Sequence, residues 1–273
     1  MSDDVTLRHA DAALVVRPAA GARAVSWTVA GHELLTGRSD HAVEHGMYPM
    51  APWAGRLRDN RVPTEGGGVT LEPTYDEWAI HGTAWDTAFA VEDVTTDAVT
   101  LTAPLGAVWP WDGVVRVDWG LADGRMSCDV EVSSAADSFP VVLGLHPWFP
   151  RRLAGGAPLE VDLAASALLD RGPDHLPTGV RREVTDVSGP FDDAFVVPSG
   201  MAALTWPGLL RLDVVATVDH APAHWYVLFD ELPDLVCLEP QTGPPDGLGA
   251  ADVHRVAPGR PVRLSTTWHW SLD

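Results

Sequence analysis

The sequence predicts an all-β protein, a large sandwich of mainly antiparallel strands. Short runs of alternating or β-branched residues recur at roughly the 8–12 residue spacing of sandwich folds. Gly, Pro or Asp clusters bound these runs, and their apolar residues repeat with the period of two that strands have. The 25 glycines and 23 prolines are spread so evenly that no window suits a helix of about ten residues or more.

The predicted strands extend along the whole chain. In order they are Leu14–Arg17, Val69–Glu72, Phe89–Val94, Val99–Thr102, Val114–Trp119, Met126–Val132, Pro140–Leu145, Leu209–Val215, Trp225–Phe229, Leu235–Leu238 and Val262–Trp270. Asp123-Gly124 offers the positive φ of a tight turn. The strands on either side of this dipeptide are therefore expected to form a hairpin.

Residues 1–273 are expected to form one domain. A chain of 273 residues is long enough for one large domain. It contains no low-complexity linker, no repeat of fixed period and no change of composition that would mark a boundary.

The charged residues exclude several classes of partner and reaction. A formal net charge of −20 at pH 7 would repel nucleic acids and anionic membranes. All 18 basic residues are arginine. A chain without lysine has no Schiff-base nucleophile, no pyridoxal anchor and no Walker-type phosphate-binding lysine.

Cysteine usage and the first residues predict a cytoplasmic protein. Cys128 and Cys237 lie far apart and are expected to be reduced thiols buried in strands. The acidic start Met1-Ser2-Asp3-Asp4 has no apolar segment behind it. The longest apolar runs fall far short of the ~18 residues that a membrane-spanning helix needs, so we expect no membrane partner.

One motif has the residue order of a metal site, but its context argues against metal. His41-Ala-Val-Glu-His45 has the His-x-x-Glu-His order of an inverted zinc protease, in which both histidines face one side of a helix. Gly37 and Gly46 bracket this segment and leave too little length for such a helix. We expect an exposed loop here, and no metal.

Polar residues stand at the ends of predicted strands, where a rigid scaffold would hold them. His146 follows Pro140–Leu145 and Glu239 follows Leu235–Leu238, and a proline comes directly after each and is expected to end the strand. Several of the 12 tryptophans lie in or beside these segments. Indole rings with Arg, Asp, Glu and His side chains suit the apolar face and hydroxyl rim of a sugar.

Five segments together carry a resemblance to a known family. They are Tyr48–Arg61, Ile80–Gly82, Gly144–Phe149, Phe191–Phe195 and Cys237–Asp246. The segment Gly-Leu-His-Pro-Trp-Phe is similar to Gly-x-His-Pro-Tyr/Phe-Phe of the galactose mutarotase (aldose 1-epimerase) family. Glu-Pro-Gln-Thr-Gly-Pro-Pro-Asp is similar to that family's Glu-Pro-x-Thr-Gly-Pro-Pro-Asp. The resemblance implies a galactose mutarotase-like supersandwich with a cleft on one face.

The resemblance also implies roles for five residues. His146 would be the general acid and Glu239 the general base. Arg56, His81 and Asp192 would hold the sugar hydroxyls and the ring oxygen.

Three details of the match bear on these roles. Asp192, rather than the adjacent Asp193, has the family's Asp-x-x-Phe spacing. Gly55 stands where the family usually has Asn, and Gly247-Leu248 stands where it usually has Ala-Phe. The first of these departures removes an amide beside Arg56 and bears on the preference for a particular sugar.

The implied activity is that of an isomerase acting on a free aldohexose such as glucose or galactose. A base takes the proton of the C1 hydroxyl while an acid protonates the ring oxygen, and the ring opens to the aldehyde. Rotation about C1–C2 and closure with reversed roles yield the other anomer, so no cofactor is required. We expect Glu239 to be ionised at pH 7 and His146 to be held partly protonated by a neighbour such as that carboxylate.

Three alternatives remain open on the sequence. A non-catalytic carbohydrate-binding or sugar-sensing protein would use the same cleft without turnover. A hexose-6-phosphate 1-epimerase would need cations for the dianion, which Arg56, Arg58 and Arg61 could supply. A β-sandwich glycoside hydrolase or lyase would use two carboxylates, for which Glu239 and Asp192 are candidates. The sugar, its preferred anomer and the oligomeric state are left open.

Overall fold

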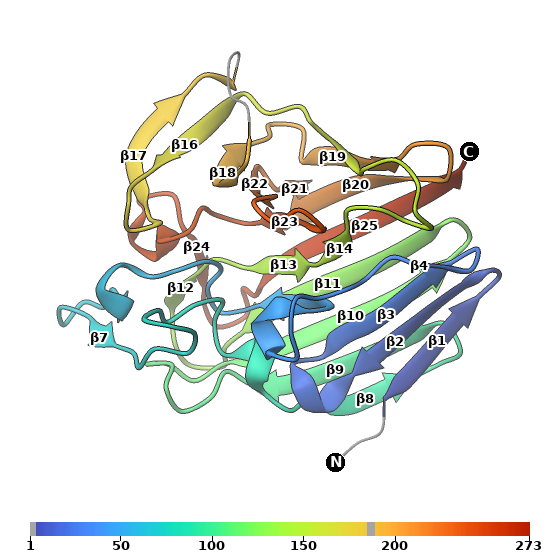
Figure 1. The fold of residues 1–273 in the computed structure, drawn as a ribbon. Helices are drawn as coiled ribbons and strands as arrows, with labels where there is room; N and C mark the ends of the chain where they lie inside the picture. Colours follow the sequence, from blue (N-terminus) through green and yellow to red (C-terminus); the bar gives the residue numbers. More distant parts are fainter. Residues whose placement is uncertain (1–3, 185–188) are drawn as a thin grey trace.

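Two large antiparallel sheets pack into a sandwich (Figure 1). The computed structural model describes residues 4–184 and 189–273. Within this part of the chain one sheet has 12 strands and the other has nine. The predicted all-β sandwich is therefore confirmed.

The 12-stranded sheet has the strand order β1-β2-β3-β5-β13-β23-β22-β18-β16-β17, with β4 paired to β3 and β14 paired to β23. Its strands are β1 (Val5–His9), β2 (Ala12–Arg17), β3 (Arg23–Val29), β4 (His32–Glu33), β5 (Met47–Met50), β13 (Gly144–Pro147), β14 (Phe149–Pro150), β16 (Ala167–Arg171), β17 (Pro177–Arg182), β18 (Asp192–Val196), β22 (Trp225–Phe229) and β23 (Leu235–Gln241).

The nine-stranded sheet has the order β15-β19-β20-β25-β11-β10-β9-β8, with β21 paired to β20. Its strands are β8 (Ala90–Val94), β9 (Ala98–Pro104), β10 (Val114–Ala122), β11 (Arg125–Ser133), β15 (Glu160–Leu163), β19 (Met201–Trp206), β20 (Leu210–Val218), β21 (Ala221–Pro222) and β25 (Val262–Leu272). The remaining elements are the pairs β6 (Arg61–Val62) with β7 (Val69–Thr70) and β12 (Phe139–Val141) with β24 (His254–Val256), and the 3₁₀ turns η1 (Pro18–Ala20), η2 (Ala42–Glu44), η3 (Arg58–Asn60), η4 (Ala84–Asp86) and η6 (Gly247–Gly249).

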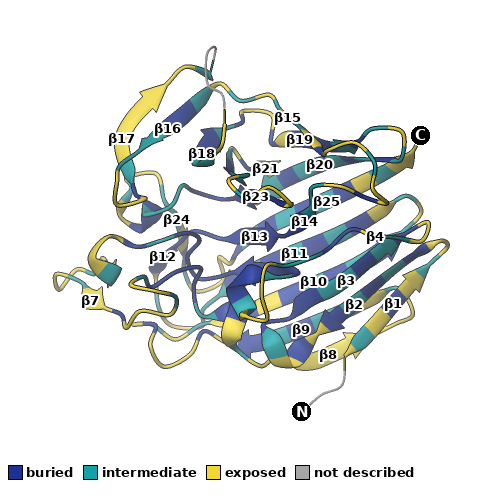
Figure 2. Ribbon diagram, in the orientation of Figure 1, coloured by how far each residue is buried: buried dark blue, intermediate teal, exposed yellow. Residues whose placement is uncertain are grey.

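The core lies between the two large sheets, where buried positions alternate along the strands (Figure 2). Trp27 of β3 meets Trp268 of β25 edge-on, with ring centroids 6.4 Å apart, and Phe149 of β14 lies 5.7 Å from the same indole. Adjacent residues of a strand point to opposite faces. Because one register runs from Phe149 back to Gly144, His146 points away from this part of the core, to the other face of the 12-stranded sheet.

Most predicted strands are confirmed, including the hairpin β10–β11. Ala122 pairs with Arg125 across a turn in which Gly124 has a φ of +64°. Trp225–Phe229 is observed as β22 with the predicted bounds. Cys128 and Cys237 are free and buried in β11 and β23, as predicted.

Two strand predictions around the candidate site are wrong. Pro140–Leu145 is not one strand, because its first residues belong to β12 and its last to β13, in different sheets. His146 and Glu239 lie within β13 and β23 rather than after them, and Pro240 is inside β23. The β23 ladder is interrupted between its pairs with β13 and β14, so a residue without an N–H group is tolerated there.

No helix in residues 4–184 or 189–273 combines the length and apolarity that crossing a bilayer requires. Most of the acidic start noted in the sequence, residues 1–3, lies outside the described residues.

Candidate active site

The five residues selected from the sequence line one pocket of about 270 Å³. His146, Glu239 and Asp192 come from β13, β23 and β18 of the 12-stranded sheet. Arg56 and His81 lie outside the named strands and also line the pocket. The structure therefore brings together residues that are up to 183 positions apart in the sequence, from Arg56 to Glu239.

Strand register places His146 opposite Glu239. Gly144 pairs with Gln241, and Phe149 pairs with Val236. Both pairs have the same antiparallel register. Continued across the residues between them, this register places His146 opposite Glu239. Nε2 of His146 lies 3.3 Å from Oε1 of Glu239, and their side chains are only 7% and 4% exposed.

Burial favours the uncharged form of both groups. It lowers the pKa of His146 to about 3, and the cations Arg23 and Arg56 act in the same direction. It also raises the pKa of Glu239 well above its usual range, an effect strengthened by the Asp192 carboxylate. The expected partly protonated His146 is therefore wrong for the protein alone, and burial also opposes the expected ionised form of Glu239, because sequence reasoning had no measure of burial.

Two aromatic rings stack on the imidazole of His146. The centroid of the Tyr48 ring lies 4.8 Å from that of the imidazole, and the centroid of the Trp148 ring lies 5.4 Å from it. The hydroxyl of Tyr48 and the indole N–H of Trp148 both donate to the carbonyl of Val43, each over 3.0 Å. These contacts fix the plane of the imidazole.

His81 is a neutral hydrogen-bond donor to the pocket. Its Nδ1 accepts the backbone N–H of Gly55 over 3.2 Å, and burial lowers the pKa of His81 well below its usual value. The hydrogen of the neutral ring must then be on Nε2. Gly55 has a φ of +72°, and a Cβ there would lie 2.7 Å from Cβ of Pro245. This packing explains why the position usually filled by Asn holds glycine.

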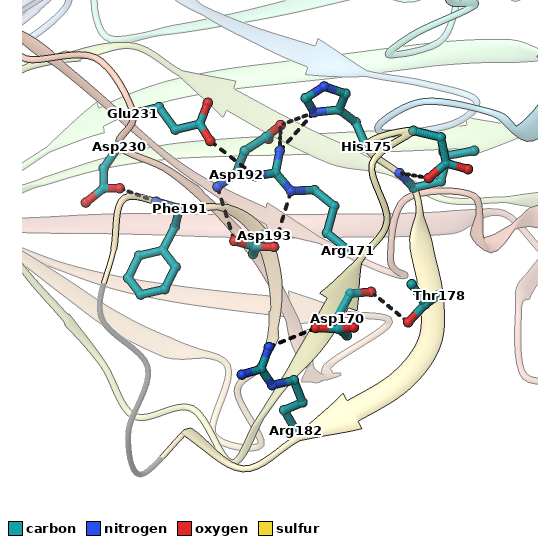
Figure 3. Close-up of polar contacts among 12 residues, drawn as sticks. Asp170, Arg171, His175, Thr178, Arg182, Phe191, Asp192, Asp193, Asp230 and Glu231 are labelled. Atoms are coloured by element: carbon teal, nitrogen blue, oxygen red, sulfur yellow. Dashed lines mark hydrogen bonds and ion pairs between the residues drawn. The ribbon is translucent and has the colours of Figure 1, made fainter.

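Asp192 is held by basic side chains, as Figure 3 shows for two of them. Its Oδ2 lies 2.8 Å from Nη1 of Arg171, 3.5 Å from Nη1 of Arg56 and 3.6 Å from Nδ1 of His175. Arg171 also reaches Asp193 at 3.5 Å and Glu231 at 3.1 Å. Both aspartates line the pocket, and Asp192 is the one that contacts Arg56.

Three buried polar atoms of the pocket residues make no hydrogen bond within the described chain. They are Nδ1 of His146, Nε of Arg56 and Oε1 of Gln241. Gln241 uses its amide N–H to donate to Oε2 of Glu239 over 3.1 Å. Buried polar atoms are nearly always paired, so a pocket with three free ones suits a ligand rich in hydroxyl groups.

Val43 and Glu44 of the segment His41–His45 line the pocket and are buried, so the exposed loop expected there is wrong for these two residues. The Glu44 side chain is 8% exposed and is bound by Arg38, Ser39 and Tyr75. Burial alone would raise the pKa of Glu44, but these hydrogen bonds outweigh it and lower the pKa to about 2. Among the described residues, no group of three His, Cys, Asp or Glu side chains is placed to hold a metal.

The sequence model of the aldose 1-epimerase family matches residues 3–241. The chain belongs to this family. The resemblance drawn from the five motifs is therefore confirmed, and it covers most of the chain. No curated protein sequence matches.

Solved structures share the fold of this aldose 1-epimerase family member. A candidate aldose 1-epimerase from Escherichia coli K12 is 21% identical, covers 99% of each chain and has a TM-score of 0.86. A galactose mutarotase-like protein from Clostridium acetobutylicum is 13% identical over 99% of this chain and 95% of its own, with a TM-score of 0.84. The GalM/aldose epimerase homologue from C. elegans is 15% identical over 100% and 99%, with a TM-score of 0.82.

Sequence reasoning did not identify all the residues that line the pocket. Glu44 was noted only as part of a metal-like pattern, and Gln241 only as part of a motif. Trp148 is the tryptophan that lines the pocket, whereas Trp53 is buried against Trp109. Nothing in the local sequence distinguishes these two indoles.

Proposed function

We propose that the protein is an aldose 1-epimerase that interconverts the α and β anomers of a free aldohexose such as glucose or galactose. The observation that carries the proposal is the buried His146–Glu239 pair, 3.3 Å apart in the pocket. A carboxyl and an imidazole at this separation can serve as the acid and the base of one ring-opening step.

The pair needs only one proton to run the reaction. Burial favours this proton on Glu239 in the free protein, so it must pass to His146 across their 3.3 Å contact before the ring opens. His146 then delivers it to the ring oxygen while Glu239 takes the proton of the C1 hydroxyl, which leaves a neutral imidazole and a protonated carboxyl beside the open-chain aldehyde. Burial favours this uncharged state. The site is therefore matched to the ring-opened intermediate rather than to the closed sugar. Closure after rotation about C1–C2 returns both protons.

Arg56, His81 and Asp192 are the proposed sugar-binding residues. The Nε2–H of His81 and the guanidinium of Arg56 donate hydrogen bonds, and Asp192 accepts them. The apolar face of the sugar packs on Trp148 or Phe229, which also line the pocket.

The charges around the pocket support an uncharged sugar over a hexose 6-phosphate. The cluster of Arg56, Arg58 and Arg61 considered for a phosphate is not assembled there, and Arg38, which also lines the pocket, is paired with Glu44. Arg58 pairs with Asp174 and Asp246, and Arg61 donates to the carbonyl of Gly67. Arg56 lies in the wall, but it is paired with Asp192.

A glycoside hydrolase is disfavoured because Asp192, the second carboxylate it would use, is already bound by two arginines. The nearest proton-exchanging partner of Glu239 is His146.

Polarimetry of freshly dissolved α-glucose and α-galactose tests the proposal. The wild-type protein should accelerate the approach to anomeric equilibrium, and His146→Asn should abolish this acceleration. His220→Asn, at an exposed histidine outside the pocket, should match the wild type. A wild-type protein that binds sugars by NMR but accelerates none would be a carbohydrate-binding protein, and acceleration confined to hexose 6-phosphates would overturn the proposed substrate.

A further inference from the structure

Arg23 is a buried cation for which the reaction described above has no use. It is 0% exposed, and in the described part of the chain it forms no ion pair with a carboxylate. Its Nη1 donates to the carbonyl of His45 over 2.5 Å and its Nη2 to that of Trp85 over 3.4 Å, while Nε has no partner. A buried arginine is normally paired with a carboxylate, so this exception needs an explanation.

Arg23 stands at the end of a row of residues that crosses four neighbouring strands. Ala24 pairs with Met47, which puts Arg23 of β3 next to Tyr48 of β5, and Tyr48 pairs with His146 of β13. The guanidinium carbon lies 4.3 Å from the centroid of the Tyr48 ring. The other face of this ring is stacked on His146, which in turn contacts Glu239.

We propose that Arg23 is a positioning residue of the acid–base pair: it holds Tyr48 against His146, and its charge drives the proton of the pair away from the imidazole. The cation attracts the negative face of the Tyr48 ring and repels a second positive charge placed behind that ring. His146 thereby becomes a stronger acid towards the ring oxygen, and the plane from which it delivers the proton is fixed.

The other charged groups around His146 do not replace this effect. Among the described residues, Glu239 is the carboxylate in contact with His146, and Asp192 acts on Glu239. Arg56 adds a second cation from the loop wall, but Asp192 pairs with it. His81, edge-on at 4.9 Å, is neutral, because its own pKa is lowered well below the usual value.

Burial lowers the pKa of Arg23 only to about 10, and it raises that of Tyr48 well above its usual value. The arginine is therefore charged, and the tyrosine neutral, over the working pH range. The charge of Asp86 raises the pKa of Arg23, but in the described part of the chain Asp86 forms no ion pair with it. Arg23 thus remains a positive charge behind the imidazole.

The first test is a ¹⁵N NMR titration of His146 in the whole protein, with the signal assigned by its absence in His146→Asn. In the wild type and in Arg23→Lys, which keeps the charge, the imidazole should stay neutral down to the lowest pH at which the protein is folded. In Arg23→Gln, whose amide can still donate to a carbonyl, the pKa of His146 should rise by on the order of one unit.

Arg151→Gln is the matched control. Arg151 also donates only to backbone carbonyls, those of Asp230, Leu232 and Leu235, and it lies outside the pocket lining. This variant should leave the titration of His146 unchanged. A folded Arg23→Gln protein with the wild-type titration would overturn the proposal.

A kinetic experiment, which rests on the proposed function, tests whether Tyr48 positions His146. Tyr48→Leu removes the ring between Arg23 and His146, and it also serves if Arg23→Gln does not fold. It should lower kcat by about tenfold or more with KM within about twofold, and an unchanged kcat would refute the role. Failure of the wild type to accelerate any anomerisation would refute the proposed function, whereas the NMR titration tests Arg23 in either case.

Discussion

Glu239→Gln should remove activity and at the same time stabilise the fold. The amide has the size of the carboxyl and can still accept the N–H of Gln241, which lies 3.1 Å from Oε2 of Glu239. It cannot exchange a proton with the sugar. An acid–base group contributes about 10²–10⁴-fold in rate, so the barrier to ring opening should rise by about 3–5 kcal/mol.

The stability gain follows from the raised pKa of Glu239. A carboxyl whose pKa is higher in the folded state stabilises the fold only while it is protonated, and this contribution is lost as the pH rises through the folded-state pKa. Each unit of upward shift costs about 1.4 kcal/mol once the group is ionised. The glutamine carries no such penalty. Its Tm should therefore exceed that of the wild type, and the difference should grow as the pH rises above the ordinary pKa of 4.5 towards the folded-state pKa, by about 2–4 °C for each kcal/mol.

Polarimetry and thermal melts over this pH range would measure both effects. Glu160→Gln, at an exposed carboxylate of β15, is the control and should leave the rate and the pH dependence of Tm unchanged. A Glu239→Gln protein with activity within about tenfold of the wild type would refute the acid–base assignment. A Tm difference that does not grow with pH would refute the account of burial.

Three further predictions concern stability and reactivity. The hydrogen bonds of Glu44 lower its pKa to about 2, although burial opposes this. The wild type should therefore be more stable than Glu44→Gln at pH 7. In thermal melts at successive pH values, this advantage should disappear as the pH falls from about 4.5 towards 2. Gly82→Ala should lower the free energy of unfolding, measured in urea, by more than about 2 kcal/mol, because the new Cβ would lie 2.0 Å from a backbone carbonyl oxygen. The control Gly31→Ala has a similar positive φ but open space around the Cβ, and its free energy of unfolding should fall by only about 1 kcal/mol. Burial raises the pKa of the Cys128 and Cys237 thiols, so a thiol reagent should leave both unmodified in the native protein and label both in urea.

Much of the architecture could be read from local patterns. The alternation along Val114–Trp119 and Met126–Val132 and the Asp123-Gly124 turn predicted a hairpin that is present, because side-chain alternation and turn chemistry are properties of a few neighbouring residues. The same reasoning joined Pro140–Leu145 into one strand, since an apolar run does not show where the chain passes from one sheet to another. Local patterns also could not show that Pro240 stands beside an interrupted ladder.

By itself, the sequence determined the all-β class, the family and the residues worth placing in a pocket, because these follow from composition, period and motif. Only the tertiary structure decided that His146 faces Glu239, that Glu44 closes the wall and that Arg23 stands behind Tyr48. It also decided that both members of the pair favour their uncharged forms. These outcomes depend on the register between strands far apart in the chain and on the exclusion of water, and neither exists until the sheets have assembled.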